Sequence, residues 1–475
     1  MIDIHYKQRK NRLVKLMQDN SLAIIIGNSE YYRTESGEYN FRVNNNLFYF
    51  TGFDEPDSIL IISKTNNRNV KSYLFCREKD ELAEIWTGYR YGTKIAKKQF
   101  GFDNTYDILS FEKNITKFLK NKQNLYFDLV PFYNNTNNLT NGFYLKIQNI
   151  ILKTLDDFSK LSKRDFFIPN QIIALQNLMQ KLRIIKDDEE IKLLKQAADI
   201  SSNAYKAMLQ KCHAGLKESN LEAELSYYFR NNDAAFNHAY SPIVASGKNA
   251  CVLHYNQNNK ILENGELVLV DAGCEYNNYA ADITRTFPVS GKFSPLQKDI
   301  YNIVLEAQKN AISYLKIGES YITSHKQAIY TLIGGLIDLK ILPKTDLETA
   351  YKEGKWQLFY MHGTSHFLGM DVHDIGLYKN LKINTKNTKN TKNNNNNNED
   401  SWIKLEKNMV LTVEPGLYFS EQALLKNNIN LNKKYFAEFK NIGIRIEDDV
   451  IINSQAEVYT TAPKTIAEIE NIMAK

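Results

Sequence analysis

The sequence predicts an α+β protein of two domains, each mixing helices with β-strands. Three observations support this. The chain has 475 residues, and a single hydrophobic core stops growing at roughly 250–300 residues, so two cores are expected. The first third holds short apolar runs bounded by turn residues, which is the pattern of strands. The remainder alternates strand-like runs with longer helical stretches.

The first domain is expected to open with a helix over residues 6–20, because Leu13, Leu16 and Met17 recur on one side of it. Four apolar runs then predict buried or half-buried strands. They are SLAIIIGNS (21–29), NLFYFTGFDEP (46–56), DSILIIS (57–63) and KSYLFC (71–76). The sequence becomes mixed and polar from about residue 163 to residue 186, so a second domain is expected to begin in this region.

The second domain is expected to begin with a helix at residues 187–190, where four acidic residues form a favourable first turn. Two further helices are predicted by capping boxes, Ser219 with Glu222 and Ser294 with Gln297. A proline directly after Ser294 suits the first helical position. These signals predict three long helices in this domain.

Strand-like segments lie between these helices. They are GELVLVDAGCEY (265–276), ADITRTFPV (281–289), MVLTVEPGLYF (409–419) and GIRIEDDVII (443–452). Residues 384–400, NTKNTKNTKNNNNNNED, are different because they form a low-complexity stretch with almost nothing apolar to bury. We expect a solvated insertion there and assign it no function.

Composition narrows the classes of function. The chain has 60 basic and 54 acidic residues, a net charge of +6 that is spread along its length, so nucleic acid is not an expected partner. The four cysteines form no CxxC pair, so reduced thiols are expected rather than disulfides. The amino terminus lacks an apolar leader pattern, and no run approaches the ~18–20 apolar residues of a membrane span. A cytoplasmic protein is expected.

Two aspartates are predicted to share one face of a hairpin. If the chain turns tightly at Asn277–Asn278, counting outward places Asp271 opposite Thr284 and puts Asp282 on the same face as Asp271. Buried together, the two carboxylates would repel each other unless positive charge lay between them. A pair of divalent metal ions, typically ~3.5–4 Å apart, would fit. A solvent-exposed face is the alternative.

Two glutamates strengthen the prediction of a metal site. Glu414 ends the apolar strand MVLTV, just before a Pro-Gly turn. Glu447 and Arg445 point to one side of their strand, while Ile444 and Ile446 point to the other. Arg445 is therefore placed to hydrogen-bond to the carboxylates and orient them.

Three of the eight histidines fall within FYMHGTSHFLGMDVHDIG, residues 359–376. Glycine and the Thr-Ser pair make HGTSH a poor helix, so a loop that presents one histidine ligand is favoured over a zinc helix. Oxygen-rich ligation with one imidazole suits manganese, cobalt or iron, with zinc also open. His254 lies apart, in ACVLHYN, and taken alone is typical of a satisfied core histidine.

These motifs, in this order, resemble those of the aminopeptidase P family, the Xaa-Pro aminopeptidases among the pita-bread metallopeptidases. The matching stretches are LVLVDAGCEYNNYAADITRTFPV, MHGTSHFLGMDVHDIG, MVLTVEPGLYF and IGIRIEDDV in the second domain, and NFRVNNNLFYFTGFDEPDSILII and ELAEIWTGYRYG in the first. The resemblance therefore covers nearly the whole chain. The insertion at 384–400 departs from the pattern but leaves every motif residue intact.

The resemblance implies a fold and a cofactor. It implies a creatinase-like mixed α/β domain over residues 1–172, followed by a pita-bread catalytic domain over residues 173–475. It also implies two divalent metal ions, most consistent with Mn²⁺ and open to Co²⁺, Zn²⁺ or Fe²⁺. In this interpretation Asp282 and Glu447 bridge the ions, and the full ligand set is Asp271, Asp282, His366, Glu414 and Glu447.

The resemblance also implies roles for the surrounding residues. A hydroxide between the ions would be the nucleophile, Glu414 would carry its proton, His373 would donate to the oxyanion and His254 would position the substrate. The catalytic set is Glu414, His373, His254, His362 and Arg445. The substrate-binding set is His362, Tyr240, Arg445 and Trp86, the last contributed by a neighbouring subunit.

The implied activity is release of the amino-terminal residue from peptides with proline in second position, by a homo-oligomer that is a dimer or a tetramer. A prolidase, which cuts only dipeptides, shares the fold and metals and stays open. A metal-free pita-bread binding protein should have lost ligand carboxylates, whereas all five ligands are present. A methionine aminopeptidase is disfavoured by the large first domain.

Overall fold

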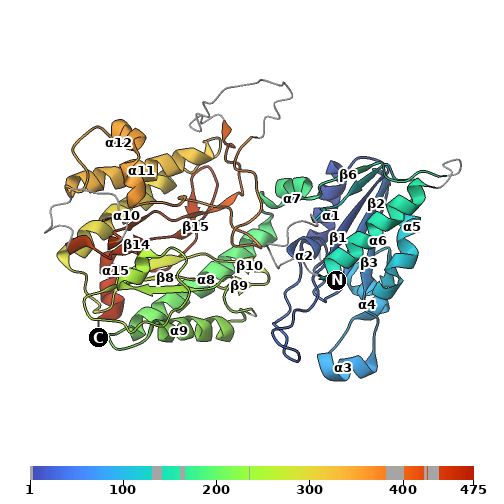
Figure 1. Cartoon of the computed structure of the whole chain (residues 1–475), viewed down its shortest axis with the longest axis horizontal. Coiled ribbons are helices and arrows are strands. Elements are labelled where there is room, and N and C mark those ends of the chain that lie inside the picture. Colours follow the sequence, from blue (N-terminus) through green and yellow to red (C-terminus); the bar gives the residue numbers. More distant parts are fainter. Residues whose placement is uncertain are drawn as a thin grey trace. The chain divides into compact units, whose positions relative to one another are not determined.

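The computed structural model describes residues 4–130, 142–160, 166–234, 236–380, 401–421, 425 and 438–474. The chain forms two compact units, Met1–Leu182 and Arg183–Lys475 (Figure 1). Both units mix helices and sheets, so the predicted α+β class is confirmed. The domain boundary expected after residue 172 stays a prediction, and the insertion at 384–400 lies outside the described residues.

The first unit is built on a six-stranded sheet of order β4-β3-β2-β1-β5-β6. Neighbours β1, β2 and β3 pair antiparallel, and the outer strands β4, β5 and β6 pair parallel with their neighbours. The strands are β1 (Ser21–Ile26), β2 (Ile59–Asn66), β3 (Asn69–Cys76), β4 (Asn104–Asp107), β5 (Asn124–Tyr126) and β6 (Gln171–Ile173). Three of the four strands predicted here are confirmed.

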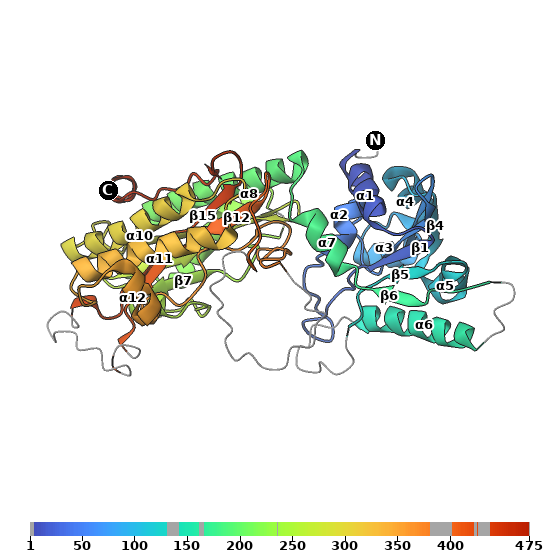
Figure 2. The ribbon, with the colours of Figure 1, turned by 90° about the horizontal axis from the view of Figure 1, so that it is seen from above.

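Helices cover both faces of this sheet. Leu22, Ile24 and Ile26 alternate along β1 toward a core that includes residues of α5 and α6. Figure 2 shows these two helices on one side of the strands and α1 and α2 on the other. The helices of this unit are α1 (Ile4–Leu16), α2 (Asn45–Thr51), α3 (Glu81–Thr87), α4 (Gly92–Phe100), α5 (Phe111–Leu119), α6 (Gly142–Ser159) and α7 (Gln176–Arg183).

The strand predicted at residues 46–56 is wrong, because this run forms α2. Asn44 caps the helix, since its side-chain oxygen accepts from the backbone N–H groups of Asn46 and Leu47. Gly52 ends the helix in a left-handed conformation at φ 66°. A short apolar run suits a buried helix turn as well as a strand, and the two caps decide between them here.

The second unit places its strands between two helix pairs, α8 with α9 and α10 with α11 (Figure 1). Every strand pair among its described residues is antiparallel. The helices are α8 (Asp188–Lys211), α9 (Glu218–Asn231), α10 (Pro295–Ser313), α11 (Tyr321–Asp338), α12 (Leu347–Glu353) and α15 (Ile466–Met473). The strands are β7 (Ile243–Ser246), β8 (Leu267–Asp271), β9 (Glu275–Tyr276), β10 (Tyr279–Ala280), β11 (Thr284–Pro288), β12 (Val410–Val413), β13 (Gly416–Tyr418), β14 (Gly443–Arg445), β15 (Asp448–Ile451) and β16 (Glu457–Val458).

Two of the three predicted helix starts are confirmed. Asp187 caps α8, and Ser294 caps α10 in a capping box. The predicted cap at Ser219 is wrong, because α9 already begins at Glu218. The reason is tertiary: Lys217 pairs with Ile261 in a β-bridge, and the backbone N–H of Glu218 donates to Lys260 O at 2.9 Å.

The hairpin register is confirmed. Asn277 and Asn278 both adopt left-handed backbones, at φ 47° and 68°, as a tight hairpin turn requires. Asp271 on β8 pairs with Thr284 on β11, as counting outward from the turn predicts. Within the described ranges, no helix is long and apolar enough to cross a membrane.

Candidate metal centre

The two aspartates come together at one tyrosine. Asp271 ends β8, and Asp282 lies just before β11. The Tyr240 hydroxyl is 2.6 Å from Asp271 Oδ1 and 2.7 Å from Asp282 Oδ1. Both aspartates are buried, with 9% and 5% of their surface exposed. The alternative of a solvent-exposed carboxylate pair is therefore wrong.

The two glutamates face each other across a second pair of strands. Val413 pairs with Asp448, and Gly416 pairs with Arg445. These two ladders share one register, so counting between them places Glu414 opposite Glu447. The turn expected at Pro415-Gly416 is wrong, because β12 and β13 continue in one register with only Glu414 and Pro415 between them, and this interruption leaves both carboxylates outside the paired strands.

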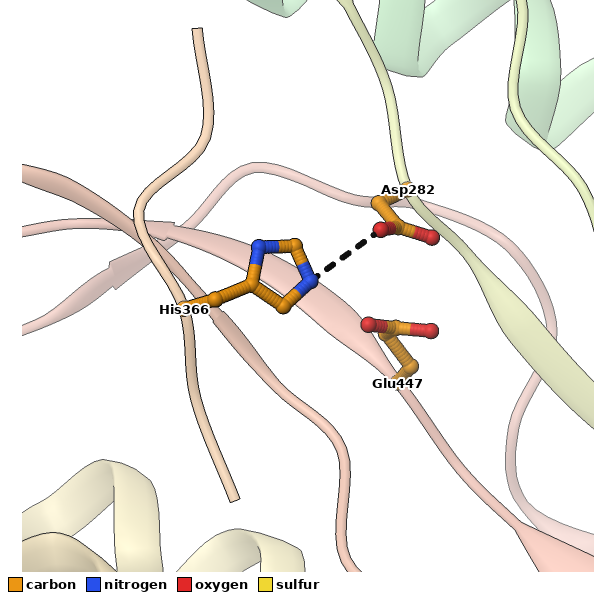
Figure 3. A group of neighbouring side chains, drawn as sticks. All are labelled: Asp282, His366 and Glu447. Carbon is orange, nitrogen blue, oxygen red and sulfur yellow. Dashed lines mark ion pairs between the residues drawn. The ribbon is translucent and has the colours of Figure 1, made fainter. Parts of the chain in front are cut away.

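His366 joins these carboxylates from a loop. Its Nε2 lies 3.3 Å from Asp282 Oδ2 and 3.7 Å from Glu414 Oε1. Figure 3 shows the imidazole pointing between Asp282 and Glu447. One ligand atom from each of these three residues lies within 4.8 Å of the others. The loop conformation predicted for HGTSH is confirmed, and the backbone N–H of Thr412, which donates to His366 O at 3.0 Å, fixes it against β12.

Arg445 connects the two carboxylate pairs. Its Nη2 donates to Asp271 Oδ2 at 2.6 Å, and its Nε donates to Thr284 Oγ1 at 3.1 Å. The Thr284 hydroxyl in turn donates to Glu447 Oε2 at 2.7 Å. A single buried guanidinium therefore orients one carboxylate directly and a second through Thr284.

The buried carboxylates of the cluster repel one another, and added positive charge would stabilise their ionised forms. Burial and the Asp282 charge hold the pKa of Glu447 well above its usual range. Burial also raises the pKa of Glu414 to about 7, although His366 opposes the shift. Burial lowers the pKa of His366, but its contact with Asp282 outweighs this and raises the value to about 9. Crowded carboxylates with one imidazole fit divalent cations, which would relieve this repulsion.

A second ring of side chains includes Tyr418, which the sequence interpretation missed. The Tyr418 hydroxyl accepts from Arg445 Nη1 at 2.9 Å and lies 2.8 Å from His362 Nε2. Burial and Arg445 lower the pKa of His362 to about 3, so this imidazole is neutral. A signal was available, since Tyr418 follows Glu414 at an even spacing and so belongs to the same alternating set.

The carboxylate cluster and His366 line one cavity of about 420 Å³. Its walls include every predicted site residue of the second unit, namely Tyr240, His254, Asp271, Asp282, His362, His366, His373, Glu414, Arg445 and Glu447. His254 is exposed here, so the alternative of a core histidine is wrong. The His373 ring stands edge-on to His366 with centroids 4.3 Å apart.

One predicted site residue, Trp86, belongs to the first unit, and the second unit holds a further cavity. Trp86 is on α3 of the first unit and is 87% exposed. A larger cavity of about 940 Å³ lies beside the loop at residues 363–365, lined mainly by aromatic and lysine side chains. It includes none of the five clustered metal-ligand candidates, so donor chemistry rather than size identifies the site.

The fold and the buried carboxylate–imidazole cluster define a metal-dependent hydrolase, and the comparisons with known proteins specify which one. Residues 192–454 match the model of metallopeptidase family M24, and residues 6–126 match the aminopeptidase P amino-terminal domain. The Xaa-Pro aminopeptidase of Escherichia coli K12 is 34% identical over 470 residues, covering 98% of this chain and 97% of its own. That of Haemophilus influenzae is 35% identical, covering 98% and 96%.

A solved structure agrees with these matches. Zinc-substituted aminopeptidase P of E. coli, in complex with product, superimposes with a TM-score of 0.86 at 34% identity, covering 99% of this chain and 98% of that one. The chain belongs to metallopeptidase family M24 and, within it, to the Xaa-Pro aminopeptidase (aminopeptidase P) family. The resemblance inferred from the motifs is confirmed.

Proposed function

We propose that this enzyme removes the amino-terminal residue from peptides whose second residue is proline, using two divalent metal ions. The observation that carries the proposal is the convergence of three buried carboxylates, the partly buried Glu414 carboxylate and one imidazole on a single cavity, in a chain of this family. The residues that would hold the ions are Asp271, Asp282, His366, Glu414 and Glu447.

Manganese is the proposed metal. Four carboxylates and one imidazole form a hard, oxygen-rich donor set, which favours Mn²⁺ over softer ions. Such a set also accepts Co²⁺, Fe²⁺ and Zn²⁺, and zinc has been substituted into the E. coli relative. Reconstitution with each ion in turn, with metal content measured beside turnover, decides among them.

The chemistry is divided between the metal ions and the side chains. When bound, the ions supply positive charge that polarises the scissile carbonyl and makes water nucleophilic at neutral pH. Glu414 takes the proton of the attacking water on a carboxylate oxygen and delivers a proton to the departing proline nitrogen. His373 donates to the developing oxyanion, and His254 positions the peptide near it. Burial and His366 lower the pKa of His373, so its ring is neutral and donates through N–H.

Proline recognition is assigned to four side chains at or behind the cavity wall, one of them from the HGTSH loop itself. The peptide bond before proline is a tertiary amide whose nitrogen carries no hydrogen, so the enzyme must recognise a ring instead of an N–H group. His362, Tyr418 and Arg445 are fixed to one another by two hydrogen bonds, and Tyr240 lines the same cavity as His362 and Arg445. His362, Arg445 and Tyr240 would contact the pyrrolidine ring, and the buried Tyr418 would hold His362 and Arg445 in place behind them.

The test compares three peptides with metal-stripped enzyme, before and after addition of Mn²⁺. An Xaa-Pro-Yaa tripeptide should be cleaved only with metal. The matching Xaa-Ala-Yaa tripeptide measures selectivity for proline, and the Xaa-Pro dipeptide tests for prolidase activity. Cleavage of the dipeptide alone would move the assignment to prolidase, and absence of metal-dependent cleavage would refute the proposal.

A homo-oligomer, dimer or tetramer, is also proposed. Four large apolar side chains are exposed on and beside α3, and another subunit could cover them: Leu82, Ile85, Trp86 and Tyr89. In such an assembly Trp86 would contact substrate in a neighbouring subunit. Light scattering on wild type and Trp86→Ala, with peptide turnover, tests both statements.

The proposed location is the cytoplasm. The support comes from the sequence, since the four cysteines are dispersed and predicted to be reduced. Fractionation of cells that express the full chain tests this location.

A further inference from the structure

His254 lies in a segment that has little secondary structure of its own. Residues 246–260, here called the His254 segment, run from the end of β7 through a short 3₁₀ helix, Gly247–Cys251, to a bridge residue, Ile261. The side chain of His254 is exposed at the cavity and forms a hydrogen bond with no described residue. Its position must therefore be set by whatever holds the segment.

The carboxylate of Glu218 holds this segment at four residues. Glu218 is fully buried, at 0% exposure, at the start of α9. Its Oε1 accepts from the backbone N–H of Ser246 at 2.7 Å, from the Ser246 hydroxyl at 2.8 Å and from Asn249 Nδ2 at 3.1 Å. Its Oε2 accepts from the Tyr255 hydroxyl at 2.8 Å and from the backbone N–H of Lys260 at 3.0 Å.

The pattern of these donors requires a carboxylate. All five are neutral N–H or O–H groups, and they are divided between the two oxygens. A glutamine would place its NH₂ group against one set of them. The Tyr255 hydroxyl can rotate to accept instead, but the backbone N–H of Lys260 cannot. The bonds also lie on both sides of His254 in the chain, so one buried side chain fixes both ends of the loop that carries it.

A second carboxylate on the same face of α9 reinforces this anchor. Glu222, one helical turn after Glu218, accepts from Asn258 Nδ2 at 2.9 Å. Asn258 is buried in a left-handed backbone conformation, φ 47°, and its Oδ1 accepts from the Val244 N–H at 2.9 Å. Helix α9 thus determines the path of the His254 segment through two glutamates.

We infer that Glu218 is a positioning residue of this enzyme: it fixes the His254 segment and thereby places the His254 imidazole at the substrate cavity. The inference rests on the proposed role of His254 in positioning substrate. Glu218 is not among the residues that line the cavity, and it acts through its hydrogen bonds to Ser246 and Asn249 before His254 and to Tyr255 and Lys260 after it.

The experiment measures kcat and KM for a proline tripeptide with the metal-loaded enzyme. Glu218→Gln should lower kcat/KM by about tenfold to a hundredfold, since small misplacements of substrate-positioning groups have effects of this order. Tyr255→Phe removes one bond and should give a smaller loss in the same kinetic parameter. Metal content should stay at the wild-type level in both variants. Glu224→Gln is the matched control, because Glu224 lies on the same helix but pairs with Lys211.

A double-mutant cycle separates positioning from general destabilisation. In a His254→Ala background, Tyr255→Phe and Glu218→Gln should each change kcat/KM by less than about twofold. The imidazole that Glu218 and Tyr255 hold in place is absent from that background. If they cost as much there as in wild type, the inference is overturned. If His254→Ala lowers turnover and neither variant does, the inference also fails, with the role of His254 intact. If His254→Ala has no effect, that role and the inference both fail. Should Glu218→Gln not fold, the Tyr255→Phe cycle alone decides.

Discussion

The Arg183 guanidinium donates to Asp374 at 2.5 Å between Nη2 and Oδ1, with both side chains almost fully buried. Lys186 Nζ donates to the other oxygen of Asp374 at 2.6 Å. The backbone N–H of Asp374 also donates to Phe367 O at 2.8 Å. This buried pairing fixes the loop that presents His373, the residue directly before Asp374, to the start of the second unit.

Asp374→Ala should therefore be strongly destabilising. It would leave two buried cations without their shared counter-charge, a change that typically costs about 3–5 kcal/mol. Asp371→Ala is the matched control, because Asp371 also pairs with Arg183 but its side chain is 44% exposed, and such pairs contribute about 0–1 kcal/mol. Urea unfolding of the metal-loaded proteins measures both. Equal losses in the two variants would contradict the argument.

Glu447→Gln should remove most of the stabilisation that metal gives the protein. Without metal, burial and the Asp282 charge disfavour the Glu447 carboxylate and raise its pKa, so a neutral amide removes a cost at pH 7.5. The metal-free variant should then unfold at an equal or higher temperature than metal-free wild type. Added Mn²⁺ should stabilise wild type by mass action and the variant much less. Turnover should be nearly abolished.

Thermal unfolding in EDTA and in Mn²⁺ measures the metal-induced rise in unfolding temperature for each protein. Glu457→Gln serves as the control, because Glu457 is about half exposed and pairs with Lys195 on the surface. An equal metal-induced stabilisation of wild type and Glu447→Gln would remove Glu447 from the site.

The hairpin of the metal centre could be predicted from local sequence because the position of its turn determines which residues of the two strands pair. Asn277 and Asn278 tolerate left-handed backbones at small cost, and the side-chain period of a strand is two. Counting outward therefore gives the observed pairing of Asp271 with Thr284. The alternation of side chains along residues 410–418, which continue in one register, likewise identifies Tyr418.

Other features depended on contacts that local patterns do not encode. The donors of Glu218 lie 28 to 42 residues away along the chain, so no spacing in the sequence indicates them. The start of α9 was misplaced for the same reason, since a bridge to Ile261 determines where the helix begins. The strand predicted at residues 46–56 is wrong for another reason. The apolar residues of this run suit a helix as well as a strand, and the capping residues Asn44 and Gly52 select the helix.

His238 should make the protein less stable at mildly acidic pH. Burial lowers the pKa of this imidazole from 6.5 to about 4, and its Nε2 lies 2.8 Å from the Ser226 hydroxyl. Because the folded-state value is the lower one, the unfolded chain binds the proton more readily. The neutral His238 imidazole therefore contributes its full share of the free energy of unfolding above pH 6.5. This share, roughly 3 kcal/mol, is lost as the pH falls from 6.5 through about 4.

Unfolding free energies between pH 7.5 and pH 4.5 measure this contribution. His238→Gln should flatten the curve over that window, since glutamine keeps a polar partner for Ser226 but does not titrate there. His213→Gln is the control, because His213 is exposed and its replacement should leave the curve as in wild type. A His238→Gln curve parallel to wild type would show that this histidine is not the cause.

Gly273→Ala should disrupt the metal centre without touching any ligand. A β-carbon at position 273 would lie 1.8 Å from the backbone oxygen of Ala281, so the hairpin strands carrying Asp271 and Asp282 would have to move apart. No side-chain rotation can relieve a clash with backbone. The variant should bind Mn²⁺ at least about tenfold more weakly, as seen when ligand orientation is lost, and should unfold at a lower temperature.

Gly334→Ala is the matched control for this prediction. Gly334 lies inside α11, and a β-carbon there would meet nothing within 4 Å. The same substitution should therefore stabilise the protein by about 0.5–1 kcal/mol through helix propensity and leave metal binding unchanged. Isothermal titration with Mn²⁺ and calorimetry on both variants provide the comparison. Wild-type metal affinity in Gly273→Ala would mean that the hairpin yields without separating the two aspartates, and the link between this glycine and the site would be lost.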